Sequence, residues 1–182
     1  IQRRVVHDPP DMAPWPPEGE PLQQHVVLCG FGRVGGSLGR ALEAFSLPYV
    51  VIDRNPDIIR RLQARRHAAS LFGDASHREL LMKAGTADAS LVIVALPEIE
   101  PAVLTVGRVR DLNPKVPILA RAHGRLEAER LGAVGATEVI QPEVEAAATL
   151  IRHTLTWFGV PKDRILDYVE QYRLSMETKR TS

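Results

Sequence analysis

Short apolar runs alternate with longer amphipathic segments along the chain from residue 25 onward. The runs are rich in β-branched residues and end at Gly, Pro, Asp or Asn, which is the pattern of buried strands. They predict strands near residues 25–30, 48–53, 68–72, 89–95, 116–121 and 136–140. The segments between them predict helices near residues 33–46, 56–66, 76–84, 98–112 and 123–133. Such alternation requires right-handed crossovers, so we expect an α/β fold with a parallel sheet covered on both faces.

The alternation stops after residue 141. Residues 142–158 form an apolar helical pattern, and a second helix is expected over about 162–173. Gly159 suits the end of the first helix and Pro161 the start of the second, so this segment predicts a helix-turn-helix appendage. An apolar helix outside a sheet usually needs a partner, so residues 142–173 are the expected dimerisation segment. Residues 174–182 are expected to form a tail.

The first strand leads directly into a glycine motif, Gly30-x-Gly32-x-x-Gly35. Gly30 allows a tight turn, Gly32 lets the backbone approach a pyrophosphate, and Gly35 lets the next helix pack closely. Asp53 ends the second strand about 20 residues later, where a carboxylate can accept hydrogen bonds from ribose hydroxyls. Strand, glycines and acid together predict a doubly wound Rossmann-type domain over residues 25–141, with six parallel strands in the order 3-2-1-4-5-6. The alternative is that the glycines serve only a strand-to-helix turn.

The residues around this motif favour an unphosphorylated ribose. The helix that begins near Arg33 points its free N–H groups and positive dipole end at the phosphates. Arg54 can in principle hold a 2′-phosphate, but Asp53 beside it would repel that group. We therefore expect NAD or an adenine nucleotide rather than NADP. We also expect Asp53→Ala to weaken nucleotide binding and to leave the fold intact.

Composition excludes several other classes. The chain has 182 residues, of which 45% are hydrophobic, and a net charge of +1, which gives no electrostatic case for nucleic acid. The single Cys29 rules out a disulfide framework and is expected to be a small buried residue. No apolar run of about 18 residues and no signal peptide are found, so we expect a soluble, cytoplasmic domain. Because the chain begins with Ile1, we expect a piece of a longer protein. The prolines of residues 1–24 predict an extended linker.

The sequence contains no recognisable catalytic set. A dehydrogenase of this class needs a substrate domain, commonly about 100 residues or more, whereas only residues 142–182 follow the sixth strand. His67, His77, His123 and His153 fall in separate segments without catalytic or metal-ligand spacing. The nucleotide is therefore expected to be bound without being turned over, and neither catalytic residues nor a metal site are predicted. A small NAD(P)-dependent oxidoreductase is the alternative of another class.

Several segments in chain order carry a resemblance to a known family. They are Cys29-Gly30-Phe31-Gly32-Arg33-Val34-Gly35, Val51-Ile52-Asp53, Gly73-Asp74-Ala75, Ala120-Arg121-Ala122 and Gly135-Ala136-Thr137-Glu138-Val139-Ile140-Gln141-Pro142. Together they resemble the RCK/KTN (TrkA-N) domains, most closely the cytoplasmic domains of Kef-type monovalent cation:proton antiporters. The likeness spans about residues 25–173 and includes the helix-turn-helix, which resembles the family's subunit-crossing helices.

The resemblance implies ligand contacts beyond the glycine loop, in which Phe31 and Val34 also lie. In the family the acid that matches Asp74, between Gly73 and Ala75, contacts adenine or its ribose. The alternative is a helix-capping role, in which Ser76 and Glu79 form a capping box. Both roles can hold together.

Further contacts are expected where the later strands end. Ala95 and Leu96 end the fourth strand at the switch point. Arg121 ends the fifth strand and can reach phosphates, as can Arg33, which can alternatively hold a partner carboxylate. Glu143 either pairs with Arg121 in the family manner or serves as a first-turn acid of its helix.

The resemblance also implies a function. In this family AMP, ADP, ATP or NAD(H) is a regulatory ligand, and the domains pair into homodimers or larger rings. The shape of the cleft is then transmitted to a membrane ion pathway, so the expected location is the cytoplasmic face of the inner or plasma membrane. A subunit of a separate potassium-uptake channel complex is a further reading. Some relatives sense glutathione, but no motif in this sequence maps to that site.

Overall fold

The structure, a computed structural model, describes residues 23–65 and 68–178. Six parallel strands form one sheet in the order β3-β2-β1-β4-β5-β6, which confirms the predicted doubly wound order. Most of the proline-rich segment predicted as a linker lies outside the described residues. The strands are β1 (Val26–Cys29), β2 (Tyr49–Asp53), β3 (Ala69–Phe72), β4 (Leu91–Val94), β5 (Ile118–Arg121) and β6 (Glu138–Ile140).

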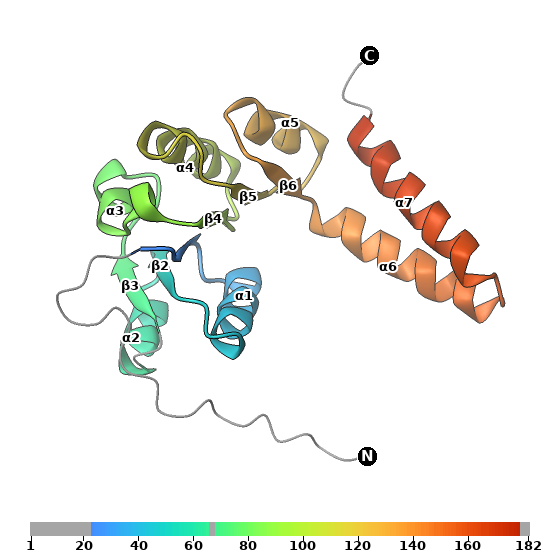
Figure 1. The fold of residues 1–182 in the computed structure, drawn as a ribbon, viewed down its shortest axis with the longest axis horizontal. Helices are drawn as coiled ribbons and strands as arrows, with labels where there is room; N and C mark the ends of the chain where they lie inside the picture. The colour runs from blue at the N-terminus through green and yellow to red at the C-terminus, as the bar shows by residue number, and fades with distance from the viewer. Residues whose placement is uncertain (1–22, 66–67, 179–182) are drawn as a thin grey trace.

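Helices cover both faces of this sheet (Figure 1). Successive side chains of a strand point to opposite faces, so Val27 and Cys29 join one core while Val26 and Leu28 join the other. The helices α1 (Arg33–Ala44) and α2 (Pro56–Arg65) cover the face of Leu28. The opposite face is covered by α3 (Arg78–Lys83), α4 (Ile99–Leu112) and α5 (Arg125–Ala133), with a 3-10 turn, η1 (Thr86–Asp88), before β4.

The strand register brings the carboxyl ends of the central strands to one edge. Cys29 of β1 lies opposite Ile52 of β2 and Val94 of β4. Backbone hydrogen bonds extend the ladder just past the strands, because the Gly30 N–H donates to Ile52 O (2.9 Å) and the Ala95 N–H donates to Cys29 O (2.8 Å). The loops after β1, β2 and β4 therefore begin side by side, which is the place where doubly wound folds bind ligands.

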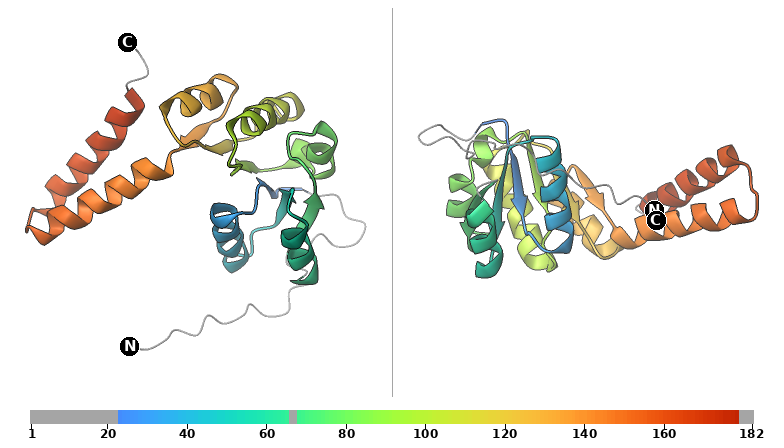
Figure 2. Two further views of the ribbon diagram at one scale, coloured as in Figure 1. Left: turned by 180° about the vertical axis from the view of Figure 1, so that it is seen from behind. Right: turned by 90° about the horizontal axis from the view of Figure 1, so that it is seen from below.

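Two helices after β6 form a hairpin that projects away from the sheet (Figures 1 and 2). The helix α6 (Pro142–Trp157) packs against α7 (Lys162–Thr178) around a small core of Ala148, Ile165 and Val169. The turn between them contains Gly159 at φ +70°. The predicted boundary at residue 173 is wrong, because α7 continues to Thr178 and residues 174–178 are helical rather than a tail. Across residues 23–65 and 68–178, no helix has the length and apolar character that a membrane span requires.

Candidate functional site

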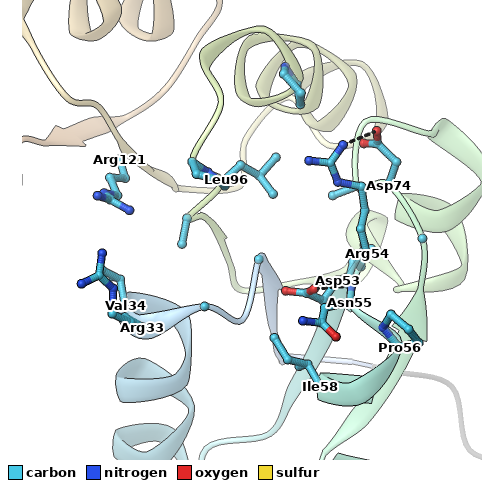
Figure 3. A pocket seen from close by; sticks show the side chains of 18 residues that line it. Arg33, Val34, Asp53, Arg54, Asn55, Pro56, Ile58, Asp74, Leu96 and Arg121 are labelled. Carbon is cyan, nitrogen blue, oxygen red and sulfur yellow. Dashed lines mark hydrogen bonds and ion pairs between the residues drawn. The ribbon is translucent and has the colours of Figure 1, made fainter. Parts of the chain in front are cut away.

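A cleft of about 930 Å³ opens over the carboxyl edge of the sheet (Figure 3). The predicted site residues that line it are Gly30, Gly32, Arg33, Val34, Asp53, Arg54, Gly73, Asp74, Ala75, Ala95, Leu96 and Arg121. Phe31, Gly35 and Glu143 are not among the lining residues. Sequence reasoning missed Ile52, Asn55, Pro56, Ile58, Pro97 and Pro101, which also line the cleft. Ile52, Asn55, Pro56 and Pro97 lie within three residues of a strand end, which is a signal the sequence offered, whereas Ile58 and Pro101 lie in the first turns of α2 (Pro56–Arg65) and α4 (Ile99–Leu112).

The three glycines of the motif meet different surroundings. Gly30 adopts φ +93°, and a Cβ there would lie 3.0 Å from Ala95 O. A Cβ on Gly35 would lie 2.1 Å from Gly30 O, so only glycine allows α1 to pack this closely against the end of β1. Gly32 differs, because a Cβ there would meet nothing within 4 Å. The backbone at Gly32 is therefore open on the side where a ligand would approach.

Asp53 fastens the glycine loop to the end of β2. Its Oδ2 accepts a hydrogen bond from the Phe31 N–H (2.6 Å), and its Oδ1 accepts one from the Asn55 N–H (2.7 Å). The Phe31 ring packs toward Gly39 of α1, where a Cβ would meet the ring at 2.5 Å. Phe31 thus contributes its backbone to the loop, while its side chain points away from the cleft. The sequence did not predict this link between Asp53 and the loop.

Two arginines face each other at the glycine-loop end of the cleft (Figure 3). Arg33 is the first residue of α1, and Arg121 ends β5. The Nε of Arg121 is buried and has no hydrogen-bond partner among the described residues. A buried guanidinium nitrogen without an acceptor is costly, and the same guanidinium group lines the cleft, where an anion is its natural counter-charge.

The predicted pair between Arg121 and Glu143 is not formed. Glu143 lies in the first turn of α6, outside the cleft, and its Oε1 is 3.6 Å from Nδ1 of His123. The physical reason is that α6 leaves the sheet after β6 and takes Glu143 with it. The position of Glu143 therefore agrees with the alternative role as a first-turn acid, which complements the helix dipole.

The opposite end of the cleft carries a cluster of charged side chains. Nη2 of Arg54 donates to both carboxylate oxygens of Glu98, at 3.1 and 3.0 Å. Nη1 of Arg54 lies 3.8 Å from Oδ2 of Asp74 (Figure 3). Glu98 is the N-cap residue of α4 and was missed by sequence reasoning. The sequence feature that could have indicated Glu98 is its position shortly after the fourth strand, which puts it at the same edge of the sheet as Arg54.

Asp74 also shapes the loop between β3 and α3. Its Oδ1 accepts a hydrogen bond from the Ser76 N–H (2.8 Å). Partial burial by itself would raise the pKa of Asp74, but the hydrogen bonds from Ser76 and the charges of Arg54 and His77 outweigh it and hold the pKa below the usual value. The predicted capping box of Ser76 and Glu79 is wrong, because the N-cap residue of α3 is His77 and no side chain caps this helix. Asp74 therefore organises the turn before the helix.

The described part of the chain offers no metal-binding site outside the cleft. Within it, no group of three His, Cys, Asp or Glu residues is arranged to hold a metal ion. His67 lies outside the described residues. Cys29 is fully buried in β1, and burial raises the pKa of its thiol to about 12.

Comparison with known proteins identifies the family. A TrkA-N domain is matched over residues 26–142, which span the whole sheet. The chain belongs to the TrkA-N family. A putative K(+) efflux antiporter KefB from Alkalimonas amylolytica is 32% identical over 155 residues, which are 85% of this chain and 23% of that protein. The TrkA-N chain thus spans about a quarter of the length of this relative.

Solved structures of TrkA-N and Kef domains share the fold. The TrkA-N domain of inner membrane protein ybaL from Escherichia coli is 32% identical, with a TM-score of 0.68, and the match covers 71% of this chain and 95% of that one. A Kef CTD from Shewanella denitrificans, in AMP-bound form, is 26% identical, with a TM-score of 0.72, and covers 84% of this chain and 92% of that one. The likeness to the Kef CTD covers more of this chain than the likeness to the ybaL domain.

Proposed function

We propose that this TrkA-N chain is a ligand-sensing module that binds an adenine nucleotide (AMP, ADP or ATP) or NAD(H) and gates a potassium or other monovalent-cation antiporter or channel. The observation that carries the proposal is the division of charge in the cleft. Two guanidinium groups face the open backbone of the glycine loop, and carboxylates lie at the opposite end. The AMP in the related Kef CTD supports the same class of ligand.

Each part of an adenine nucleotide has residues suited to it. The phosphates would lie between the N-terminus of α1 and the side chains of Arg33 and Arg121, where free N–H groups and planar cations favour anions. The ribose hydroxyls would donate to Asp53, at the end of β2. The amino group of adenine would donate to Asp74, above the apolar side chain of Leu96.

The cleft is suited to binding rather than to chemistry. Among the described residues, its lining contains no His, Lys, Tyr, Ser, Thr or Cys, and its two carboxylates, Asp53 and Asp74, are engaged by backbone N–H groups of the neighbouring loops. We therefore propose that the module is not an enzyme. The alternative, a small NAD(P)-dependent oxidoreductase, would have to use one of these carboxylates as its proton relay.

The hairpin of α6 and α7 supports a homodimer. Trp157 and Phe158, at its tip, are 90% and 82% exposed, and Leu150 and Tyr168 are exposed along its sides. Apolar surface of this kind usually marks an interaction site. We infer that a second copy covers the hairpin, and that such dimers are also the unit of any larger ring. A nucleotide that binds one packing of the subunits better than another by about 1–3 kcal/mol would be sufficient for regulation.

The partner of the module in transport is a membrane portion, in the same chain or in a separate subunit. The related antiporter is several times longer than this chain, which supports a fused arrangement. The module would then act at the cytoplasmic face of the inner or plasma membrane. Glutathione is not assigned to any residue.

The test is titration calorimetry of the chain with AMP, ATP and NADH, after mass spectrometry has identified any ligand carried through purification. Arg121→Gln is expected to weaken AMP binding about tenfold or more, since it removes a charge-assisted contact to phosphate. Arg125→Gln is the matched control, because Arg125 lies on α5 and pairs with Glu129 outside the cleft. Failure of all three nucleotides to bind would refute the proposal. Oxidation of NADH by the chain with any carbonyl substrate would favour the oxidoreductase instead.

A second measurement tests the dimer. Light scattering is expected to give twice the mass of one chain, and Trp157→Ser with Phe158→Ser to give one chain mass. A wild-type chain that remains a monomer at high concentration, with and without AMP, would exclude the proposed assembly.

A further inference from the structure

Arg54 stands where many nucleotide-binding domains hold a 2′-phosphate, yet its guanidinium group is already engaged. It follows Asp53 directly, at the end of β2. Both oxygens of Glu98 accept hydrogen bonds from its Nη2, and Asp74 lies 3.8 Å from its Nη1. The three loops that follow β2, β3 and β4 are thus joined through one side chain at the ribose end of the cleft.

The charges at this end add up to an environment that repels anions. Two carboxylates, those of Asp74 and Glu98, lie beside the guanidinium of Arg54. Asp53, the preceding residue, lines the same cleft and adds a third carboxylate, so the four groups together carry a formal charge of −2. A 2′-phosphate would bring about two more negative charges to the same place. An arginine at this position ordinarily accommodates that phosphate, but here the carboxylates hold the guanidinium toward α4.

We propose that Glu98 is a positioning residue that, by holding Arg54, closes the cleft to 2′-phosphorylated nucleotides. The inference rests on the proposed function and deepens it, since it names the ligand class as adenine nucleotides with a free 2′-hydroxyl. The sequence indicated only that Asp53 opposes a 2′-phosphate. The structure adds that the arginine beside it is occupied by an acid from a different loop.

The size of the effect follows from the exposure of the pair. Arg54 and Glu98 have about half of their side-chain surface exposed, so an isolated pair of this kind would be weak. The contact is strengthened because Nη2 of Arg54 reaches both oxygens of Glu98 and Asp74 lies on the other side of the guanidinium. A 2′-phosphate would have to displace Glu98 while it lies in a cleft that Asp53 also lines. We expect discrimination of about tenfold or more, which is what one unfavourable charge contact of this type gives near a protein surface.

The experiment compares 5′-AMP with adenosine 2′,5′-bisphosphate by calorimetry, because the two ligands differ only in the 2′-phosphate. In the wild-type chain the bisphosphate is expected to bind about tenfold more weakly or worse. Glu98→Gln removes the negative charge that holds Arg54 and is expected to reduce the ratio of the two dissociation constants about fivefold or more. Arg54→Gln, a second variant, removes the cation and is expected to keep or increase the ratio.

Glu100→Gln is the matched control. Glu100 lies two positions along α4, carries the same charge and pairs with Arg130 instead, so its loss is expected to leave the ratio unchanged. A merely structural role of Glu98 would weaken the binding of both ligands alike and would not change the ratio of their dissociation constants.

Equal binding of the two ligands to the wild-type chain would overturn the inference and leave the proposed function intact. An equal change of the ratio in Glu98→Gln and Glu100→Gln would also overturn it. If neither ligand binds, the proposed function fails together with the inference.

Discussion

Asp53→Ala is expected to loosen the glycine loop as well as to weaken nucleotide binding. The Phe31 N–H is partly buried and donates to Oδ2 at 2.6 Å, so the loss of this acceptor costs about 1–3 kcal/mol. The Asn55 N–H is exposed, and water replaces Oδ1 there at a cost below about 1 kcal/mol. We therefore expect the free energy of unfolding to fall by about 2 kcal/mol. The sequence alone predicted that Asp53→Ala would leave the fold intact, whereas the structure predicts this loss of stability.

The same substitution removes the proposed acceptor of the ribose hydroxyls. Hydrogen bonds to a carboxylate contribute about 1.5–3 kcal/mol, so the dissociation constant of AMP is expected to rise about 10- to 100-fold. Asp53→Asn keeps one acceptor oxygen for the Phe31 N–H and is expected to lose less stability than Asp53→Ala, while it still weakens AMP binding.

Urea unfolding followed by circular dichroism measures the first effect, and calorimetry with AMP measures the second. Glu129→Gln is the control for the loss of a negative charge, because Glu129 pairs with Arg125 on the surface of α5 and such a pair contributes about 0.5 kcal/mol or less. An unfolding free energy of Asp53→Ala within about 0.5 kcal/mol of the wild type would refute the structural part of the reasoning. If the affinity for AMP were unchanged, Asp53 would not be the residue that contacts the ribose.

Three further predictions concern the core and the loops. Gly35→Ala is expected to lower the free energy of unfolding, measured by heat or urea, by more than about 3 kcal/mol, because the added Cβ would lie 2.1 Å from Gly30 O. Gly36→Ala is the control and is expected to be tolerated, because its Cβ would lie 3.8 Å from the nearest atom. Cys29 is buried and is expected to react with a thiol reagent at about pH 8 only as fast as the chain unfolds. Burial raises the pKa of the folded thiol to about 12, so the unfolded thiol loses its proton first. The free energy of unfolding is therefore expected to fall as the pH rises above about 9. Arg110→Met is expected to cost about 2–4 kcal/mol in urea unfolding, because Arg110 donates to two loop carbonyl oxygens at 2.5 and 2.8 Å.

The sheet was predictable from the sequence because parallel strands buried on both faces leave near-continuous apolar runs. Leu28 and Val51 are fully buried in such runs, and their strands have the predicted order. The limits of the elements were less predictable. The fourth strand was expected from residue 89 but begins at Leu91, because the 3-10 turn η1 ends only at Asp88 and two residues separate it from the strand. The third helix begins at Arg78 rather than near residue 76, because Asp74 holds Ser76 in a turn.

The parts of the site that belong to single strand ends were predictable, and the contacts between loops were not. Gly30, Asp53 and Arg121 line the cleft because each directly follows or ends a strand. The pairing of Arg54 with Glu98 depends on how far two side chains from different loops extend toward each other, which no spacing along the chain encodes. The pairing of Glu143 likewise depends on the direction in which α6 leaves the sheet.

The segment after β5 connects the cleft to the base of the hairpin, so under the proposed function it offers a short route from the phosphate site to α6. Arg121 lines the cleft, while His123, two residues later, lies 3.6 Å from Glu143 in the first turn of α6. Between them the Ala122 N–H donates to Ile140 O (3.0 Å), which ties the segment to β6. Consecutive Cα atoms are about 3.8 Å apart, so a small displacement at Arg121 reaches the base of α6 over only two residues. Regulation through this route requires that the ligand bind the two packings with different affinity, because equal affinity would shift no equilibrium however tightly it binds.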